Sequence, residues 1–464
     1  MKRTARWFAV GAATLAAALW VIDDRKIIPI GAEVQTAVRW IAILAMCVFA
    51  ALRRSLTTWI LVSMFVGIEI GHDFPTSDWP HVAEYAQLLS KIFLRLIKTI
   101  VAPLLFATLV VGIAGHPDLK KVGRLGIKSF IYFEVVTTIA LFIGLAAINI
   151  SKAGVGIEQI ESAEEVPTVT PQSTTGVLLA AFPENIAKSV AEGQVLQVVV
   201  FSILFGIALA MLPEPKRRPM LAFAEGLAET MFKFTKIVMY FAPIGVGAAI
   251  AFTVGHMGLD ILYNLFKLLA TLYAALLVFL LFVLLPIALI ARVPIKRFVQ
   301  AVAEPVSIAF ATTSSEAALP RAMDAMEKLG VPRSTVAFVL PTGYSFNLDG
   351  TTLYLSLATI FVAQAANIDL SLTQQLAIVF TLMLTSKGVA GVPRASLVIL
   401  LGTASSFGLP LLPITFILAI DELMDMARTS VNVIGNCLAT VVMARWEGDF
   451  HPERAAADNV PTEI

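Results

Sequence analysis

The chain is poor in charge and in the residue types that most often bind metals or form disulfides. Only 14% of its 464 residues are charged, whereas a soluble globular domain carries about 25%, and 58% are hydrophobic. Its two cysteines, Cys47 and Cys437, lie in apolar stretches, and its five histidines fall mostly in expected loops or at helix ends, so we predict no disulfide, metal site or cofactor. A net charge of +1, with no basic run interleaved with aromatic residues, argues against a nucleic-acid partner. The composition therefore predicts a polytopic membrane protein.

Apolar runs long enough to cross a bilayer recur along the chain. They lie near residues 56–71, 88–115, 126–150, 190–212, 228–255, 261–292, 332–366 and 413–445. Two further segments, about 298–329 and 370–410, are interrupted by polar, Gly and Pro residues, and we expect them to form re-entrant hairpins. Lys and Arg gather after alternate spans and mark the cytoplasmic side. We therefore expect an all-α, multi-pass protein of the inner (cytoplasmic) membrane.

The first 55 residues add two apolar stretches before these spans. Residues 7–22 follow a basic start and are compatible with either a signal peptide or a short spanning helix. A second stretch covers about 41–52. We favour an added N-terminal hairpin of apolar helices, and the sequence leaves both alternatives open. Residues 447–464 are polar and are expected to form a cytoplasmic tail.

Charged side chains are concentrated inside the last hydrophobic segment. On a helix, its polar residues fall within about an 80° sector. They are Asp421, Asp425, Arg428, Asn432 and Asn436. An ionisable residue in the membrane costs several kcal/mol unless it is paired or hydrated, so this face predicts a binding site for something polar in mid-membrane.

A second polar interruption has the composition of a cation site. The segment 346–352 places Asn347, Asp349 and a glycine in mid-span. Glycine weakens the helix and frees carbonyl oxygens, and Asp349 adds negative charge, which together resemble the way transporters coordinate cations. A kinked helix with satisfied polar groups is the alternative. Taken singly, the Ser and Thr run 312–315 is compatible with helix packing, and the Gly-rich segment 386–393 with an ordinary loop.

Taken together and in this order, the motifs resemble those of the dicarboxylate/amino acid:cation symporter family, the glutamate transporter family. The matching pieces are Ser314-Ser315 to Leu319-Pro320, Asn347-Leu-Asp-Gly-Thr351, Gly388-Val-Ala-Gly-Val-Pro393 and Asp425-Met-Ala-Arg-Thr-Ser-Val-Asn432. The resemblance covers roughly residues 55–448.

This resemblance implies a homotrimer in which each protomer has eight core transmembrane helices and two re-entrant hairpins. A scaffold, about 56–125 and 190–258, would hold the trimer. A transport unit, about 126–150 and 261–446, would cross the bilayer as an elevator.

The resemblance also implies a substrate site. Arg428 would pair with the side-chain carboxylate of the substrate, and Asp425 would receive its ammonium group. The implied substrate-binding residues are Ser314, Ser315, Thr351, Val392, Asp425, Arg428, Thr429 and Asn432. Residue chemistry agrees, because a guanidinium binds a carboxylate bidentately and a buried Asp needs a cation. The alternative is that Arg428 and Asp425 neutralise each other.

The chain departs from the sodium-coupled pattern of this family. Relatives that use sodium have Asp where this chain has Asn436, and they have hydroxyl side chains where it has Phe133 and Val136, which leaves Thr137 as the remaining hydroxyl. Two sodium sites therefore look damaged. This pattern is similar to the proton-coupled bacterial branch, so we expect H⁺ as the coupling ion and keep Na⁺ as an alternative.

Glu134 is an apparently unpaired acid beside these positions and is our first candidate for a proton carrier, because burial favours the neutral form of a carboxyl group. A structural, hydrogen-bonded Glu is the alternative, and Glu316 is a second candidate. The residues expected to take part in cation or proton coupling are Glu134, Thr137, Gly343, Asn347, Asp349, Glu316, Asp421 and Asn436.

The predicted function is uptake of glutamate or aspartate together with protons. A C4-dicarboxylate ranks second because it has no ammonium to pair with Asp425. A membrane hydrolase using Ser314 or Ser315 would need a His or Lys base at depth; no His lies in these segments and Lys387 falls at a hairpin tip, so we predict no enzyme. A channel is the other rival, and only a carrier would show trans-stimulated exchange.

Overall fold

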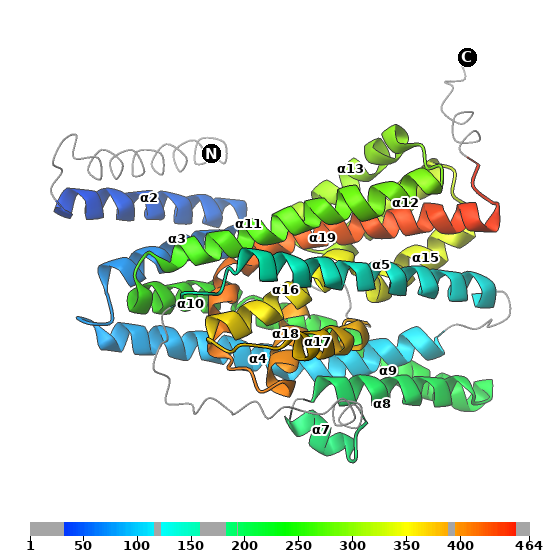
Figure 1. Ribbon diagram of the computed structural model, residues 1–464, viewed down its shortest axis with the longest axis horizontal. Coiled ribbons are helices and arrows are strands. Elements are labelled where there is room, and N and C mark those ends of the chain that lie inside the picture. The colour runs from blue at the N-terminus through cyan, green and yellow to red at the C-terminus, as the bar shows by residue number, and fades with distance from the viewer. Residues whose placement is uncertain (1–31, 116–121, 158–181, 193, 388–394, 452–464) are drawn as a thin grey trace. The chain divides into compact units, whose positions relative to one another are not determined.

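The computed structural model describes residues 32–115, 122–157, 182–192, 194–387 and 395–451. These residues form helices joined by turns, with no strand among them (Figure 1), which confirms the all-α expectation. Within the described ranges, four helices are long and apolar enough to cross a membrane, or up to five if one bent pair of helices is counted as a span. The first apolar stretch and the polar tail, expected at 7–22 and 447–464, lie wholly or mostly outside the described residues.

The chain divides into two compact units. The described part of the first unit comprises residues 32–96, 237–265 and 415–422. Its helices α3 (Leu56–Asp73) and α10 (Ala242–Met257) pack against each other at small residues. A Cβ atom added at Gly71 would lie 2.7 Å from the carbonyl oxygen of Ala251, so only glycine permits this approach.

The added N-terminal region contributes helix α2 (Ala32–Arg53), which packs on α3 through buried charge. Arg39 places its Nε 2.5 Å from Glu69 and its Nη2 3.0 Å from Asp73. The indole of Trp40 donates to the other oxygen of Asp73 over 2.8 Å. Charged groups within apolar helices need such partners, so these contacts fix α2 against α3.

The second unit holds the segments with polar motifs. Its helices, some of which begin or end in the first unit, are α4 (Pro80–Ala114), α5 (Val122–Ser151), α7 (Ile186–Glu192), α8 (Val195–Ala210), α9 (Glu214–Met239), α11 (Ile261–Phe279), the π-helical η1 (Leu280–Leu284), α12 (Leu285–Ile290), α13 (Ile295–Thr312), α14 (Ser315–Lys328), α15 (Arg333–Phe346), α16 (Asp349–Ala365), α17 (Leu372–Thr385), α18 (Ala395–Ser406) and α19 (Leu412–Glu447). Helix α16 is buried along nearly its whole length and packs against α5, α17 and α18. A helix that is apolar on all sides is expected in such a position.

The helix boundaries agree with most of the expected spans. The two interrupted segments each form a pair of helices, α13 with α14 and α17 with α18, and the segment 332–366 is broken between Phe346 and Asp349 as expected. The expected span 228–255 covers α9 and α10, which are bent by 49° at their junction because the chain turns at Tyr240 and Phe241 and Pro243 starts a new helix. Taken together, the two helices are long and apolar enough to form one broken span. Re-entrance of the helix pairs and the division into scaffold and transport unit remain predictions.

The close packing of α5 against α16 can be tested by substituting the glycine at their contact. A Cβ at Gly144 would collide with the carbonyl oxygen of Leu353 and the hydroxyl of Ser356. We therefore expect Gly144→Val to lower stability by about 1–3 kcal/mol through overpacking, measured by thermal unfolding of the purified protein in detergent. Gly226→Val on α9 is the control, since nothing lies within 4 Å of an added Cβ there. Equal losses in both variants would contradict this interpretation.

Candidate functional site

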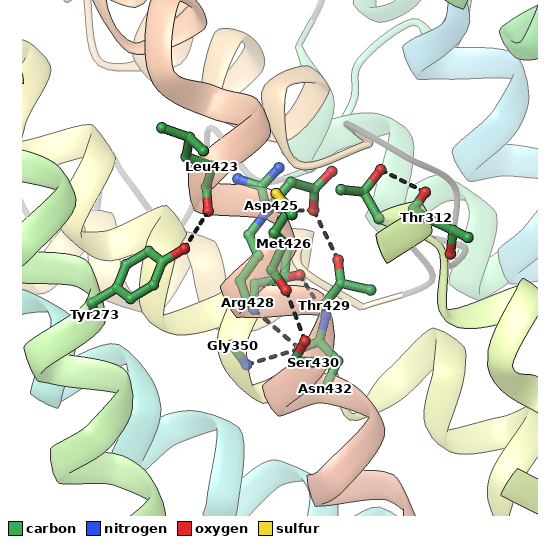
Figure 2. A network of polar contacts seen from close by, with 12 residues as sticks. Tyr273, Thr312, Gly350, Leu423, Asp425, Met426, Arg428, Thr429, Ser430 and Asn432 are labelled. Atoms are coloured by element: carbon green, nitrogen blue, oxygen red, sulfur yellow. Dashed lines mark hydrogen bonds and ion pairs between the residues drawn. The ribbon is translucent and has the colours of Figure 1, made fainter. Parts of the chain in front are cut away.

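Helix α19 carries the predicted polar face, and all of its members are buried. Asp425, Arg428, Thr429 and Asn432 follow one another along this helix (Figure 2). Arg428 is the largest of the nearly fully buried side chains, with 1% of its surface exposed. Asp421, one turn earlier on the same helix, is also buried. The helix therefore withdraws several charged groups from solvent along one face, and each requires compensation.

Arg428 and Asp425 compensate each other. The Nε of Arg428 donates to Oδ1 of Asp425 over 2.8 Å, and the hydroxyl of Thr429 donates to the same oxygen over 2.9 Å. The guanidinium carbon lies 4.1 Å from the centre of the Tyr354 ring, a cation–π contact in a site closed to water. Mutual neutralisation, the alternative kept open from the sequence, is therefore the arrangement that the structure shows. The guanidinium is held in place by a carboxylate and a ring.

Asn432 joins α19 to the start of α16. Its Oδ1 accepts from the backbone N–H groups of Gly350 (2.8 Å) and Thr351 (3.2 Å), and its Nδ2 donates to the hydroxyl of Thr351 (2.9 Å). The first N–H groups of any helix lack an intrahelical partner, so Asn432 caps α16 from another helix. A Cβ atom at Gly350 would collide with the backbone of Arg428. The two helices can therefore approach each other here because residue 350 is a glycine.

The break between α15 and α16 exposes carbonyl groups, and Asn436 binds two of the nearby ones. Its Nδ2 donates to the carbonyl oxygens of Asn347 (3.1 Å) and Asn432 (2.9 Å). Asn347 donates to Oδ2 of Asp349 (3.2 Å) and to Oδ1 of Asn436 (3.4 Å), and its own N–H bonds to the carbonyl of Gly343 (2.7 Å). The structure thus brings four of the predicted coupling residues together at the break.

The α5 side of the break differs from the prediction. Glu134 was expected to be unpaired, but its Oε2 lies 3.2 Å from the Nζ of Lys387, and its side chain is 47% exposed. Lys387, from the end of α17, also donates to the hydroxyl of Thr137 over 2.6 Å and to the carbonyl of Phe346 over 3.3 Å. The expectation was wrong because the lysine comes from a segment far along the sequence. A proton carried by Glu134 would have to break this ion pair.

The turn between α13 and α14 presents the first Ser motif. Thr313 adopts a left-handed conformation with φ of 51°, which is uncommon for a β-branched residue and is often found at functional turns. Ser314 caps α14 by accepting from the N–H of Ala317 over 3.3 Å, and Ser315 is buried. Glu316, the second candidate proton carrier, lies in the first turn of α14 with an exposed side chain. The remaining predicted substrate residue, Val392, lies outside the described residues.

Tyr354 and Lys387 contact the polar groups of the site but were not predicted from the sequence. Tyr354 follows Thr351 by one helical turn, so its position on the same face of α16 was available as a signal. Lys387 was considered only as a base for a membrane hydrolase and was set aside because it falls at a hairpin tip. Only the fold shows that its ammonium instead turns inward, to the break between α15 and α16.

Comparison with known proteins fits this geometry. The chain is 44% identical to a proton/sodium-glutamate symport protein of Bacillus caldotenax, over 85% of this chain and 95% of that protein. It is 43% identical to a proton/glutamate-aspartate symporter of Escherichia coli (strain K12), over 88% and 96%. A C4-dicarboxylate transport protein of Anaeromyxobacter sp. (strain K) is 40% identical over 89% and 95%.

The family model for sodium:dicarboxylate symporters matches residues 56–446, which include the whole polar face of α19 and both helix pairs. Such a match covers far more than half of the chain, and it confirms the resemblance seen in the motifs. This protein is a multi-pass membrane transporter rather than an enzyme, and it belongs to the sodium:dicarboxylate symporter family.

Proposed function

We propose that this protein takes up acidic amino acids, glutamate or aspartate, together with protons. The observation that carries the proposal is the buried pair of Arg428 and Asp425 on α19. A substrate with a side-chain carboxylate and an ammonium group offers a partner to each. Binding would replace one internal ion pair by two, so that neither buried charge is left alone while the pair opens.

The surrounding groups suit the same substrate. Thr351, Thr429 and Asn432 lie next to the pair with hydroxyl and amide groups that can bind a second carboxylate. Ser314 and Ser315, at the turn of the first helix pair, offer further hydroxyl and backbone groups for the substrate, as the family resemblance implies. We further propose that the protein acts as a homotrimer in the inner membrane, by elevator-type movement of the transport unit.

A C4-dicarboxylate is the second candidate. It is favoured by the 40% identity to the C4-dicarboxylate transport protein named above and by Arg428, which fits either class of substrate. Asp425 distinguishes the two classes, because a dicarboxylate brings no ammonium to it and would place like charges together in a site of low dielectric constant. We therefore rank the amino acid first.

Proton coupling is supported by the side chains at the break. Phe133 and Val136 are buried and offer no side-chain oxygen atoms, and Asn436 presents an amide where sodium-using relatives carry a carboxylate. A sodium ion would therefore find fewer side-chain oxygen ligands here than in those relatives. Asp349, buried beside Asn347, and Glu134 remain candidate carriers of the proton.

Arg428 should set the substrate class. In Arg428→Cys the buried carboxylate of the substrate has no cation, at a cost of about 3–5 kcal/mol, and we expect uptake of radiolabelled glutamate into proteoliposomes to fall to background. Arg445→Cys, near the exposed end of the same helix, is the matched control and should transport normally. Unchanged glutamate uptake by Arg428→Cys would refute the assignment.

Asp425 should distinguish amino acids from dicarboxylates. We expect Asp425→Asn to weaken glutamate binding by about tenfold or more, because a charge-assisted hydrogen bond to the ammonium is lost, while succinate binding is spared or improved. Competition against radiolabelled glutamate measures both effects, with Asp449→Asn at the exposed end of α19 as control. If succinate outcompetes glutamate on the wild type, the dicarboxylate is the substrate.

An inward pH gradient should drive uptake without sodium. Glutamate accumulation is measured in proteoliposomes under separately imposed pH and sodium gradients. Glu134→Gln should abolish accumulation driven by pH but permit exchange, because the amide resembles the protonated acid. Glu304→Gln, which alters an exposed ion pair with Arg321, is the control. A requirement for a sodium gradient, together with indifference to pH, would contradict proton coupling.

A further inference from the structure

The broken segment between α15 and α16 creates a local demand for positive charge. The last carbonyl groups of α15 point toward the break, where the helix dipole is negative. Asp349, fully buried at the start of α16, adds a carboxylate. Its Oδ1, like the Oδ1 of Asn347, accepts no hydrogen bond from any residue that the structure describes. Carbonyl oxygens and carboxylates at broken helices are the groups with which transporters coordinate cations.

Lys387 brings a positive charge to this break. Its ammonium donates to the carbonyl of Phe346, the last residue of α15, and to the hydroxyl of Thr137 on α5. It also forms the ion pair with Glu134. Only 13% of the lysine side chain is exposed. The ammonium thus contacts a carbonyl oxygen, a hydroxyl oxygen and a carboxylate, the same chemical groups that would bind a small monovalent cation.

Lys387 does not contact Glu134 alone, because its ammonium also binds two neutral oxygen acceptors. A partly exposed lysine–glutamate pair by itself contributes little. Here the two neutral acceptors, Thr137 and the Phe346 carbonyl, satisfy the remaining protons of the ammonium, and one of them belongs to the break itself. A few residues away the amide of Asn436 donates to the carbonyls of Asn347 and Asn432. Nitrogen donors of the chain therefore bind two successive carbonyl oxygens at the end of α15, those of Phe346 and Asn347.

We propose that Lys387 is a built-in cation: a specificity-determining residue whose ammonium takes the place of a coupling sodium ion at the α15–α16 break. The proposal deepens the proposed function and rests on it. Because the lysine directly follows α17, its ammonium also connects the end of that helix to α5 and α15. A free sodium ion would have to displace a tethered charge, and transport then proceeds without sodium.

The test removes the ammonium and asks whether a free cation replaces it. Glutamate exchange is measured in proteoliposomes without any gradient, with choline, sodium or methylammonium present equally on both sides. Wild-type exchange is expected to be the same in all three. Lys387→Met should lose about tenfold or more of its exchange in choline, since the carboxylate of Glu134, the hydroxyl of Thr137 and the carbonyl of Phe346 lose their charged donor. Sodium or methylammonium should restore most of it, and Lys387→Arg should keep measurable exchange in choline.

Lys328→Met is the matched control, because Lys328 forms an exposed ion pair with Asp324 on α14 and should behave as wild type in every buffer. If the Met variant aggregates on gel filtration, Lys387→Gln, which retains a hydrogen-bond donor, takes its place with the same expectations. The inference is overturned if the variant exchanges normally in choline, or if neither cation restores it. If the wild type exchanges succinate but not glutamate, the amino-acid proposal fails, and the same comparison is made with succinate.

Discussion

Charge withdrawn from water inside apolar helices is the constraint on which the rest of this structure depends. Every ionised group in the second unit that faces the interior has to be compensated by another part of the chain. Arg428 is compensated by Asp425 and the Tyr354 ring, and the break at Asn347 by donors from α17 and α19. Close packing of α5 on α16 at Gly144, where no side chain fits, holds the helix that begins at this break.

Internal compensation also explains how such a site can work as a carrier. A substrate that brings one carboxylate and one ammonium group replaces internal partners without leaving a bare charge, so loaded and empty states are both tolerated in the membrane. In the proposed function, a substrate without the ammonium would bring a second carboxylate to Asp425 with no cation to offset it. We therefore propose that Arg428 and Asp425 select the substrate through the partners that each charge loses and gains.

The sequence predicts the elements better than the contacts. Apolar runs and Gly and Pro interruptions are local signals, so the helix pairs and the break at 347–348 were found from the sequence alone, and the motif order identified the family. The pairing of Glu134 was not found, because its partner Lys387 lies in a different element and no local pattern connects them.

In the proposed mechanism the chain supplies its own cation at the break and carries an acidic amino acid with protons. A simultaneous measurement of radioactive sodium, proton and glutamate fluxes into proteoliposomes of the wild-type protein tests this mechanism. We expect glutamate to enter with protons, and sodium influx to stay the same when glutamate is added. Sodium entering in fixed proportion to glutamate would rule the mechanism out.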